Sequence, residues 1–335
     1  MIKDSDIEFH TPENADYLWA ETNYFGFSIP EEKIMGSVYV VIRKGLGVMS
    51  ADVSIWSAVT DNRAECLHVN NHQHLPAPKS MSDIETPIGL RVQASSPRNY
   101  RIDYQGFDDT ELEIDFKGLM EPFDIHDPNH SPKAVIDDST KAAEGSGFGT
   151  GYGGHFDLTG KLTGRLKLKG KEYKIDCVET MDHSWGPRPE THMVPIGWMH
   201  AHYSEDLAFH WILLCDYQKP VGQQQQLAHG YVLENGKVYG LTDMKISTVR
   251  SGVVTIGHDV ELTDVRGKVW RMHGSVESGS PWVCYISTMV YVCNMRWTMP
   301  DGKVGYGVSQ ENHAIQELNA QRGKLWSDQQ SKITS

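Results

Sequence analysis

The chain has 335 residues, of which 39% are hydrophobic and 10% aromatic, and its formal net charge is -13 at pH 7. This length predicts about two domains, each able to bury a hydrophobic core. The acidic charge argues against nucleic acid or an anionic membrane surface as a partner, because no strongly basic run offsets the repulsion. No stretch approaches the roughly 18 apolar residues of a membrane span. Because the N-terminus also lacks a secretory signal, we expect a cytoplasmic protein.

The first half of the chain has the pattern of short β-strands. Residues 19–27 gather aromatic side chains around one acid, which predicts a segment that packs on a domain seam or a pocket wall. From residue 36 onward, apolar runs bounded by Gly, Asp or Asn predict strands. Residues 121–154 are rich in Pro and Gly and lose this periodicity. They are therefore interpreted as a domain boundary or a long functional loop.

The second half repeats the strand pattern more regularly. Asn235-Gly236 separates two apolar runs, which is a strong signal for a two-residue hairpin. Only residues 312–318 and 320–326 have a weak helical pattern. Evenly spaced strands with tight turns predict an all-β protein of two domains, each a lipocalin-like barrel or a sandwich. We place these domains at residues 1–150 and 151–335.

Residues 181–188, with the sequence MDHSWGPR, concentrate chemically active side chains. If they enter as a strand, the two-residue alternation puts His183 and Trp185 on one face and Asp182 and Ser184 on the other. The Gly-Pro pair then ends the strand. One interpretation is a strand end in which the acid pairs with the closing arginine, and the other is a functional site.

A second candidate is a histidine pair. His200 and His202 lie in a predicted strand, so both imidazoles face the same side, and Glu205 follows closely. This arrangement is similar to the metal site of cupin-type barrels. However, Glu205 comes one or two residues early and no third histidine stands at the usual distance, so we expect no metal.

Other reaction classes lack their motifs. The chain has no Walker or dinucleotide fingerprint, no hydrolase nucleophile elbow and no cysteine with a basic neighbour. Acid–base chemistry without a cofactor remains. His183 could donate or accept a proton near neutral pH, and Trp185 could stabilise a developing cation. Glu311 ends the last predicted strand, where an apolar cavity would raise its pKa and make it a general acid; a rim position is the alternative.

Several motifs, taken together, have a familiar arrangement. They are HFD at 155–157, GKLTG at 160–164, YKID at 173–176 and DHSWGPR at 182–188, with weaker marks at 19–22, 305–308 and Glu311. This set resembles the lipocalin-like two-domain family of carotenoid 1,2-hydratases (hydroxyneurosporene synthases) and related Diels-Alderases. The resemblance implies a hydrophobic ligand near the seam of two β domains, and no metal. In the hydratases the His and Trp of the core motif are implicated in adding water to an isoprenoid double bond, and they match His183 and Trp185.

We therefore expect a cofactor-free hydratase or dehydratase that acts on a small hydrophobic substrate such as a terpenoid-like alkene or alcohol. The catalytic candidates are His183, Trp185, Asp182 and Glu311. The substrate-binding candidates are Tyr24, Phe25, Arg188, His200, His202 and His210. Within residues 181–188, His183 and Trp185 are predicted to face the cavity, while Asp182 and Arg188 brace the turn. The alternatives are an isomerase or cyclase and a non-catalytic carrier of hydrophobic ligands, and a homo-oligomer is left open.

Overall fold

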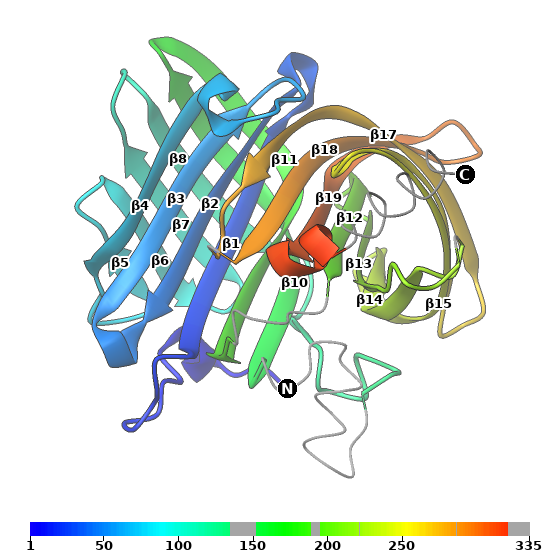
Figure 1. Cartoon of the computed structure of the whole chain (residues 1–335), viewed down its shortest axis with the longest axis horizontal. Coiled ribbons are helices and arrows are strands. Elements are labelled where there is room, and N and C mark those ends of the chain that lie inside the picture. Colours follow the sequence, from blue (N-terminus) through cyan, green and yellow to red (C-terminus); the bar gives the residue numbers. More distant parts are fainter. Residues whose placement is uncertain (135–151, 189–194, 221, 286, 321–335) are drawn as a thin grey trace, which may run out of the picture.

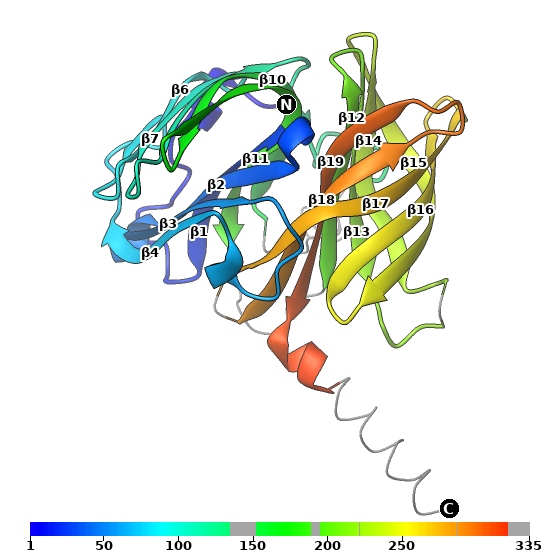
Figure 2. The same cartoon turned by 90° about the horizontal axis from the view of Figure 1, so that it is seen from above.

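The fold is almost entirely β and consists of a curled sheet beside a closed eight-stranded barrel (Figure 1 and Figure 2). The computed structural model describes residues 1–134, 152–188, 195–220, 222–285 and 287–320. The predicted all-β, lipocalin-like architecture of two domains is confirmed. Across these ranges, no helix combines the length and the apolar composition that crossing a membrane requires.

The curled sheet is built from strands between residues 19 and 187. Its strands are β1 (Trp19–Ile29), β2 (Ile34–Arg43), β3 (Val48–Trp56), β4 (His68–Pro76), β5 (Asp83–Glu85), β6 (Leu90–Ser96), β7 (Asn99–Gln105), β8 (Glu111–Gly118), β9 (Phe123–Asp124), β10 (Gly154–Leu168) and β11 (Lys171–Pro187). In the described residues, short 3-10 helices accompany them: η1 (Asp4–Ile7), η2 (Pro30–Glu32), η3 (Lys44–Leu46) and η4 (Arg63–Glu65). The strand order is β4-β3-β2-β1-β11-β10-β8-β7-β6-β5, and β9 pairs with β10.

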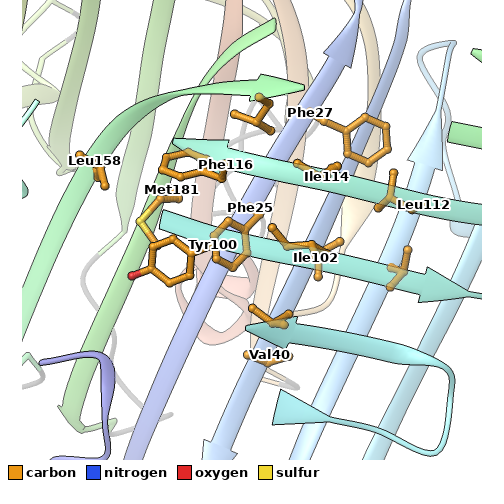
Figure 3. Close-up of a cluster of buried hydrophobic side chains, with 14 of the residues drawn as sticks. Phe25, Phe27, Val40, Tyr100, Ile102, Leu112, Ile114, Phe116, Leu158 and Met181 are labelled. Atoms are coloured by element: carbon orange, nitrogen blue, oxygen red, sulfur yellow. The ribbon is translucent and has the colours of Figure 1, made fainter. Parts of the chain in front are cut away.

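The curled sheet encloses its own hydrophobic core. Phe25 and Met181, from β1 and β11, pack in one buried cluster with Tyr100 and Phe116 from β7 and β8 (Figure 3). Because side chains alternate along a strand, the neighbouring residues of β1 point the other way, toward the barrel. The aromatic segment 19–27 therefore serves two surfaces, the core of this sheet and the wall that faces the barrel.

The barrel closes in chain order. Its strands are β12 (Ile196–Ser204), β13 (Leu207–Cys215), β14 (Gln225–Glu234), β15 (Lys237–Ser251), β16 (Val254–Asp264), β17 (Val269–Trp282), β18 (Thr288–Thr298) and β19 (Val304–Ala314). Asn235 and Gly236, with φ of 51° and 74°, form the predicted hairpin between β14 and β15. The helix predicted at 312–318 occupies residues 315–320 instead, because Asn312 to Ala314 still pair with β18. The helix predicted at 320–326 falls, beyond its first residue, outside the described residues.

The change from sheet to barrel comes later than the predicted boundary between residues 150 and 151. β10 pairs with β8 and β11 pairs with β1, so both strands complete the curled sheet. The barrel begins only at Ile196. Local periodicity could not reveal this, because β11 joins a strand more than 150 residues earlier in the chain. Residues 181–188 therefore belong to the curled sheet rather than to the C-terminal barrel.

The curled sheet and the barrel meet along a buried interface, which we call the seam. Trp198 and Ile212 of the barrel pack with Tyr24 and Met35 of the sheet. Val59 and Gly279 add an isolated β-bridge between the two. Groups from distant parts of the sequence are thus enclosed together, away from solvent.

Candidate active site

A cavity of about 60 Å³ lies at the seam. Both the curled sheet and the barrel contribute to its wall. The lining residues are Thr22, Tyr24, Tyr39, Tyr152, His155, Asp182, Ser184, Ile196, Trp198, Trp282, Cys284, Tyr285, Thr288, Gln310 and Asn312. The wall contains both aromatic rings and hydrogen-bonding groups, as do pockets that hold an apolar substrate and orient one polar group on it.

Strand β11 presents the opposite face to the one predicted. The alternation itself is as expected, but Asp182 and Ser184 line the cavity, whereas His183 and Trp185 do not appear in its described lining. Met181 explains the difference, because it is fully buried in the core of the curled sheet and shares its face with His183. The apolar end of that face thus points into the sheet core, and the more polar face points to the barrel.

Asp182 is the acid at this cavity. Its surface is partly open to the cavity, yet its Oδ1 is buried and has no hydrogen-bond partner. Burial raises the pKa of Asp182 to about 7, and the nearby negative charge of Asp157 adds to the effect, while His155 and Arg188 oppose it. The carboxyl group therefore holds its proton up to neutral pH, as a general acid requires.

His155 stands beside Asp182 and belongs to an ion-paired group. Its Nε2 lies 3.1 Å from Asp157 Oδ2, and Trp198 Nε1 donates to Asp157 Oδ1 over 3.0 Å. Burial opposes ionisation of both groups, but their attraction raises the pKa of His155 and lowers that of Asp157. The sequence reasoning did not select these residues as site residues, although their His-x-Asp spacing places both on the face of one strand.

His210, a predicted substrate-binding residue, supports this pair from the barrel. Its Nε2 lies 3.1 Å from Asp157 Oδ2, and its side chain is fully buried. It is not part of the described cavity wall. His210 and His155 thus approach the same carboxylate oxygen of Asp157 from the two sides of the seam.

Tyr24 and Phe25, both predicted to bind substrate, divide between two surfaces. Tyr24 lines the cavity, and its ring meets Trp198 edge to face at a centroid distance of 5.1 Å. Its hydroxyl group is buried without a hydrogen-bond partner. Phe25 points the other way and packs on Tyr100 in the sheet core, so it does not contact the cavity.

Arg188 lies behind the cavity wall. It donates a hydrogen bond to Ser184 Oγ over 2.8 Å, and its guanidinium stacks on the ring of Tyr152 at 3.8 Å. Among the described ion pairs none joins Arg188 to Asp182, so the predicted brace runs through Ser184 instead. The arginine thereby fixes two lining residues.

His183 and Trp185 form a separate cluster on the other face of β11. His183 Nδ1 lies 2.9 Å from the carbonyl oxygen of Thr22, and its Nε2 is buried without a partner. The ring of His10 stacks on Trp185 at 3.7 Å. Burial lowers the pKa of His183 to about 4, so the ring is neutral at neutral pH.

His200 and His202 face the same side of β12, as predicted, and that side is the seam. Both lie near Glu179 of β11, at 3.5 Å and 3.7 Å between His Nδ1 and Glu179 Oε2. Glu205, the acid suggested by sequence spacing, is instead an exposed residue that pairs with Lys161. The acid beside the two histidines thus comes from the other sheet, and neither histidine lines the cavity in the described residues.

Glu311 does not fit the predicted general acid. Its carboxylate lies inside the barrel and receives hydrogen bonds from Arg250, one of them 2.7 Å long, and from Thr255. Burial alone would raise its pKa, but the hydrogen bonds and charge of Arg250 lower it. Glu311 is therefore ionised at neutral pH, and it belongs to a structural ion pair.

Comparisons with known proteins agree with this fold. The family described as Domain of unknown function (DUF7064) matches residues 3–315. No curated protein sequence matches the chain. Kievitone hydratase from Nectria haematococca superposes with a TM-score of 0.54 at 11% identity, covering 88% of each chain. A protein provisionally named AttH, from Nitrosomonas europaea, superposes with a TM-score of 0.56 at 10% identity, covering 93% of this chain and 96% of that one. At identities this low, the two superpositions show that the folds are alike and show nothing further.

Proposed function

We propose, from the premise that the chain belongs to the DUF7064 family, that it is a hydratase or dehydratase whose reaction takes place in the seam cavity. The observation that carries this proposal is Asp182, a carboxyl group on the cavity wall whose pKa is raised to about 7. The fold shared with kievitone hydratase supports the same reaction class. A terpenoid-like or aromatic alkene or alcohol is the proposed substrate class.

In the hydration direction, Asp182 transfers its proton to one carbon of the double bond, and the π electrons form the new C–H bond. Water then attacks the cationic carbon, and its surplus proton returns to the Asp182 carboxylate. Trp198 and Trp282 line the cavity, where an indole face stabilises a desolvated cation by up to about 2 kcal/mol. Dehydration follows the reverse path, with Asp182 protonating the departing hydroxyl group.

His155 positions the oxygen in this scheme. It lines the cavity, and although burial opposes its ionisation the charge of Asp157 raises its pKa, so it can donate a hydrogen bond to the attacking or departing water. His183 and Trp185, whose residue types match the hydratase motif, lie on the opposite face of β11, behind Asp182.

The size of the cavity restricts the proposal. Ligand pockets usually measure roughly 300–1,000 Å³, whereas this one measures about 60 Å³. A substrate with an isoprenoid body therefore requires the aromatic side chains of the wall to move apart on binding. A carrier of stored lipid fits less well, because the interior of the curled sheet is filled by its own side chains (Figure 3).

A screen of isoprenoid and aromatic alkenes and alcohols, read by product mass, tests the reaction class. We expect at least one substrate to change by the mass of one water. Products of unchanged mass would identify an isomerase or cyclase instead. Tight binding without any product, for every ligand that binds, would identify a carrier.

A further inference from the structure

Three buried side chains at the seam have a spacing that direct hydrogen bonds do not explain. Glu179 Oε2 lies 3.5 Å from His200 Nδ1 and 3.7 Å from His202 Nδ1. Hydrogen bonds between nitrogen and oxygen measure roughly 2.7–3.2 Å, so both separations are too long. Atoms that share a tetrahedral zinc ion, at roughly 2.0–2.2 Å each, stand about 3.4 Å apart. The observed distances match those between two ligand atoms of one zinc ion.

Two of the three atoms are without partners. Glu179 Oε2 and His202 Nδ1 are buried and form no hydrogen bond in the described part of the chain, and on His200 the other ring nitrogen, Nε2, has none. His200 Nδ1 receives only a long bond, of 3.3 Å, from the backbone nitrogen of Val308. An unpaired buried polar group destabilises the folded state, so several in one place indicate a missing partner.

Outer contacts hold the cluster in position. His202 Nε2 bonds to Thr180 Oγ1 over 2.9 Å, and Thr180 continues to Thr159 over 3.1 Å. Such a contact fixes a ligating imidazole and leaves its other nitrogen for the ion. Next to Glu179, a Cβ at Gly26 would lie 3.6 Å from Oε2 and 3.5 Å from the hydroxyl oxygen of Tyr24. The glycine leaves room there for a fourth ligand, a water molecule or Tyr24 itself.

In the other described groups of histidines and acids, the carboxylate already has hydrogen-bond partners. Asp157 Oδ2 lies 3.1 Å from His155 Nε2, and Asp157 Oδ1 accepts a hydrogen bond from Trp198 Nε1. In the third group, Glu21 Oε1 accepts a hydrogen bond of 2.9 Å from the backbone N–H of His10. The group at Glu179 is set apart because its Oε2 is buried and accepts no hydrogen bond from the described residues.

From these observations we propose that Glu179, His200 and His202 bind one divalent transition-metal ion, of which zinc is the best match. Two imidazoles and one carboxylate suit zinc and disfavour calcium or magnesium, which prefer oxygen ligands. The ligands come from β11 and β12, so the ion joins the curled sheet to the barrel. It stands behind Tyr24, and it stabilises the seam without taking part in proton transfer at Asp182.

The site is tested by titrating zinc into the chelator-treated full-length protein and measuring the binding by calorimetry. We expect one zinc ion per chain, a higher melting temperature with zinc than without, and the visible absorption of tetrahedral cobalt when cobalt replaces zinc. Glu179→Gln keeps the shape of the side chain, and His202→Asn removes a ligand. Each is expected to weaken zinc binding more than 100-fold, and Thr180→Ala about 10–100-fold.

His210→Asn is the matched control, since it removes a buried histidine from the neighbouring strand and should leave zinc affinity unchanged. Circular dichroism of each metal-free variant confirms that it folds. The proposal is overturned if the parent protein binds no zinc, if Glu179→Gln binds it as tightly as the parent, or if His210→Asn abolishes binding.

Discussion

The barrel interior and the seam each enclose a carboxyl group, and they hold it in opposite charge states. Inside the barrel, Glu311 receives hydrogen bonds from Arg250, and its pKa falls although it is buried. At the seam, Asp182 has no ion-pair partner among the described residues, and its pKa rises to about 7. Enclosure alone therefore does not create a general acid. The absence or presence of a paired cation decides whether a buried carboxyl group stores a proton or a charge.

Removing the guanidinium group of Arg250 from the barrel should have the largest effect, which is on the stability of the protein. Arg250→Ala leaves the Glu311 carboxylate buried without its partner, which costs about 3 kcal/mol or more of unfolding free energy. Urea denaturation measures this loss. The double variant Arg250→Met with Glu311→Leu removes both charges and should be clearly more stable than Arg250→Ala. Equal stability of the two variants would show that the ion pair does not govern this region.

Replacing the carboxyl group of Asp182 at the seam should abolish most activity while leaving the stability of the protein nearly unchanged. Asp182→Asn keeps the size and polarity of the side chain but cannot donate an acidic proton. We expect kcat/KM to fall about 100-fold, the lower end of the range for general acid catalysis. The assay uses the substrate found by product mass. Activity within a few-fold of the parent would assign the acid to another group.

The pH dependence of the reaction examines the same carboxyl group without mutation. Asp182 faces His155, Asp157 and Arg188, and its folded-state pKa is raised from 3.8 to about 7. Under the proposed mechanism the proton that Asp182 donates is present below pH 7, and kcat/KM should fall about tenfold per pH unit above it. The stability contributed by this group has the same sign: it is complete below pH 3.8 and is lost as the pH rises through 7. Activity that increases above pH 7 would contradict the assignment.

Substitution of the adjacent residue should have the smallest effect on catalysis. His183→Ala alters the face of β11 that points away from the cavity, so kcat/KM should change less than about threefold. Stability should fall by about 1 kcal/mol, because the hydrogen bond to the Thr22 carbonyl oxygen is lost. Parallel assays of His183→Ala and Asp182→Asn decide which face of β11 is catalytic. A loss in His183→Ala as large as that in Asp182→Asn would return the catalytic role to the imidazole.

The fold was more predictable than the site. Strand alternation and the Asn235-Gly236 turn are local properties, so they indicated β-structure and one hairpin directly from the residues. The role of Glu311 depended on Arg250, which lies on a different strand and far away in sequence. Glu205 was the nearest acid to His200 in the chain, but Glu179 is the nearest in space.

Residues 181–188 show which features the sequence alone determines and which depend on the tertiary structure. The two-residue period determined that Asp182 and Ser184 share one face and His183 and Trp185 the other. Which face meets the cavity depends on the partners of the whole strand, since Met181 belongs to the core of the curled sheet and Asp182 meets the barrel. The alternation of side chains is a property of a single strand. Which face of the strand points to the sheet core and which to the barrel is decided by how the strand is buried between these two layers.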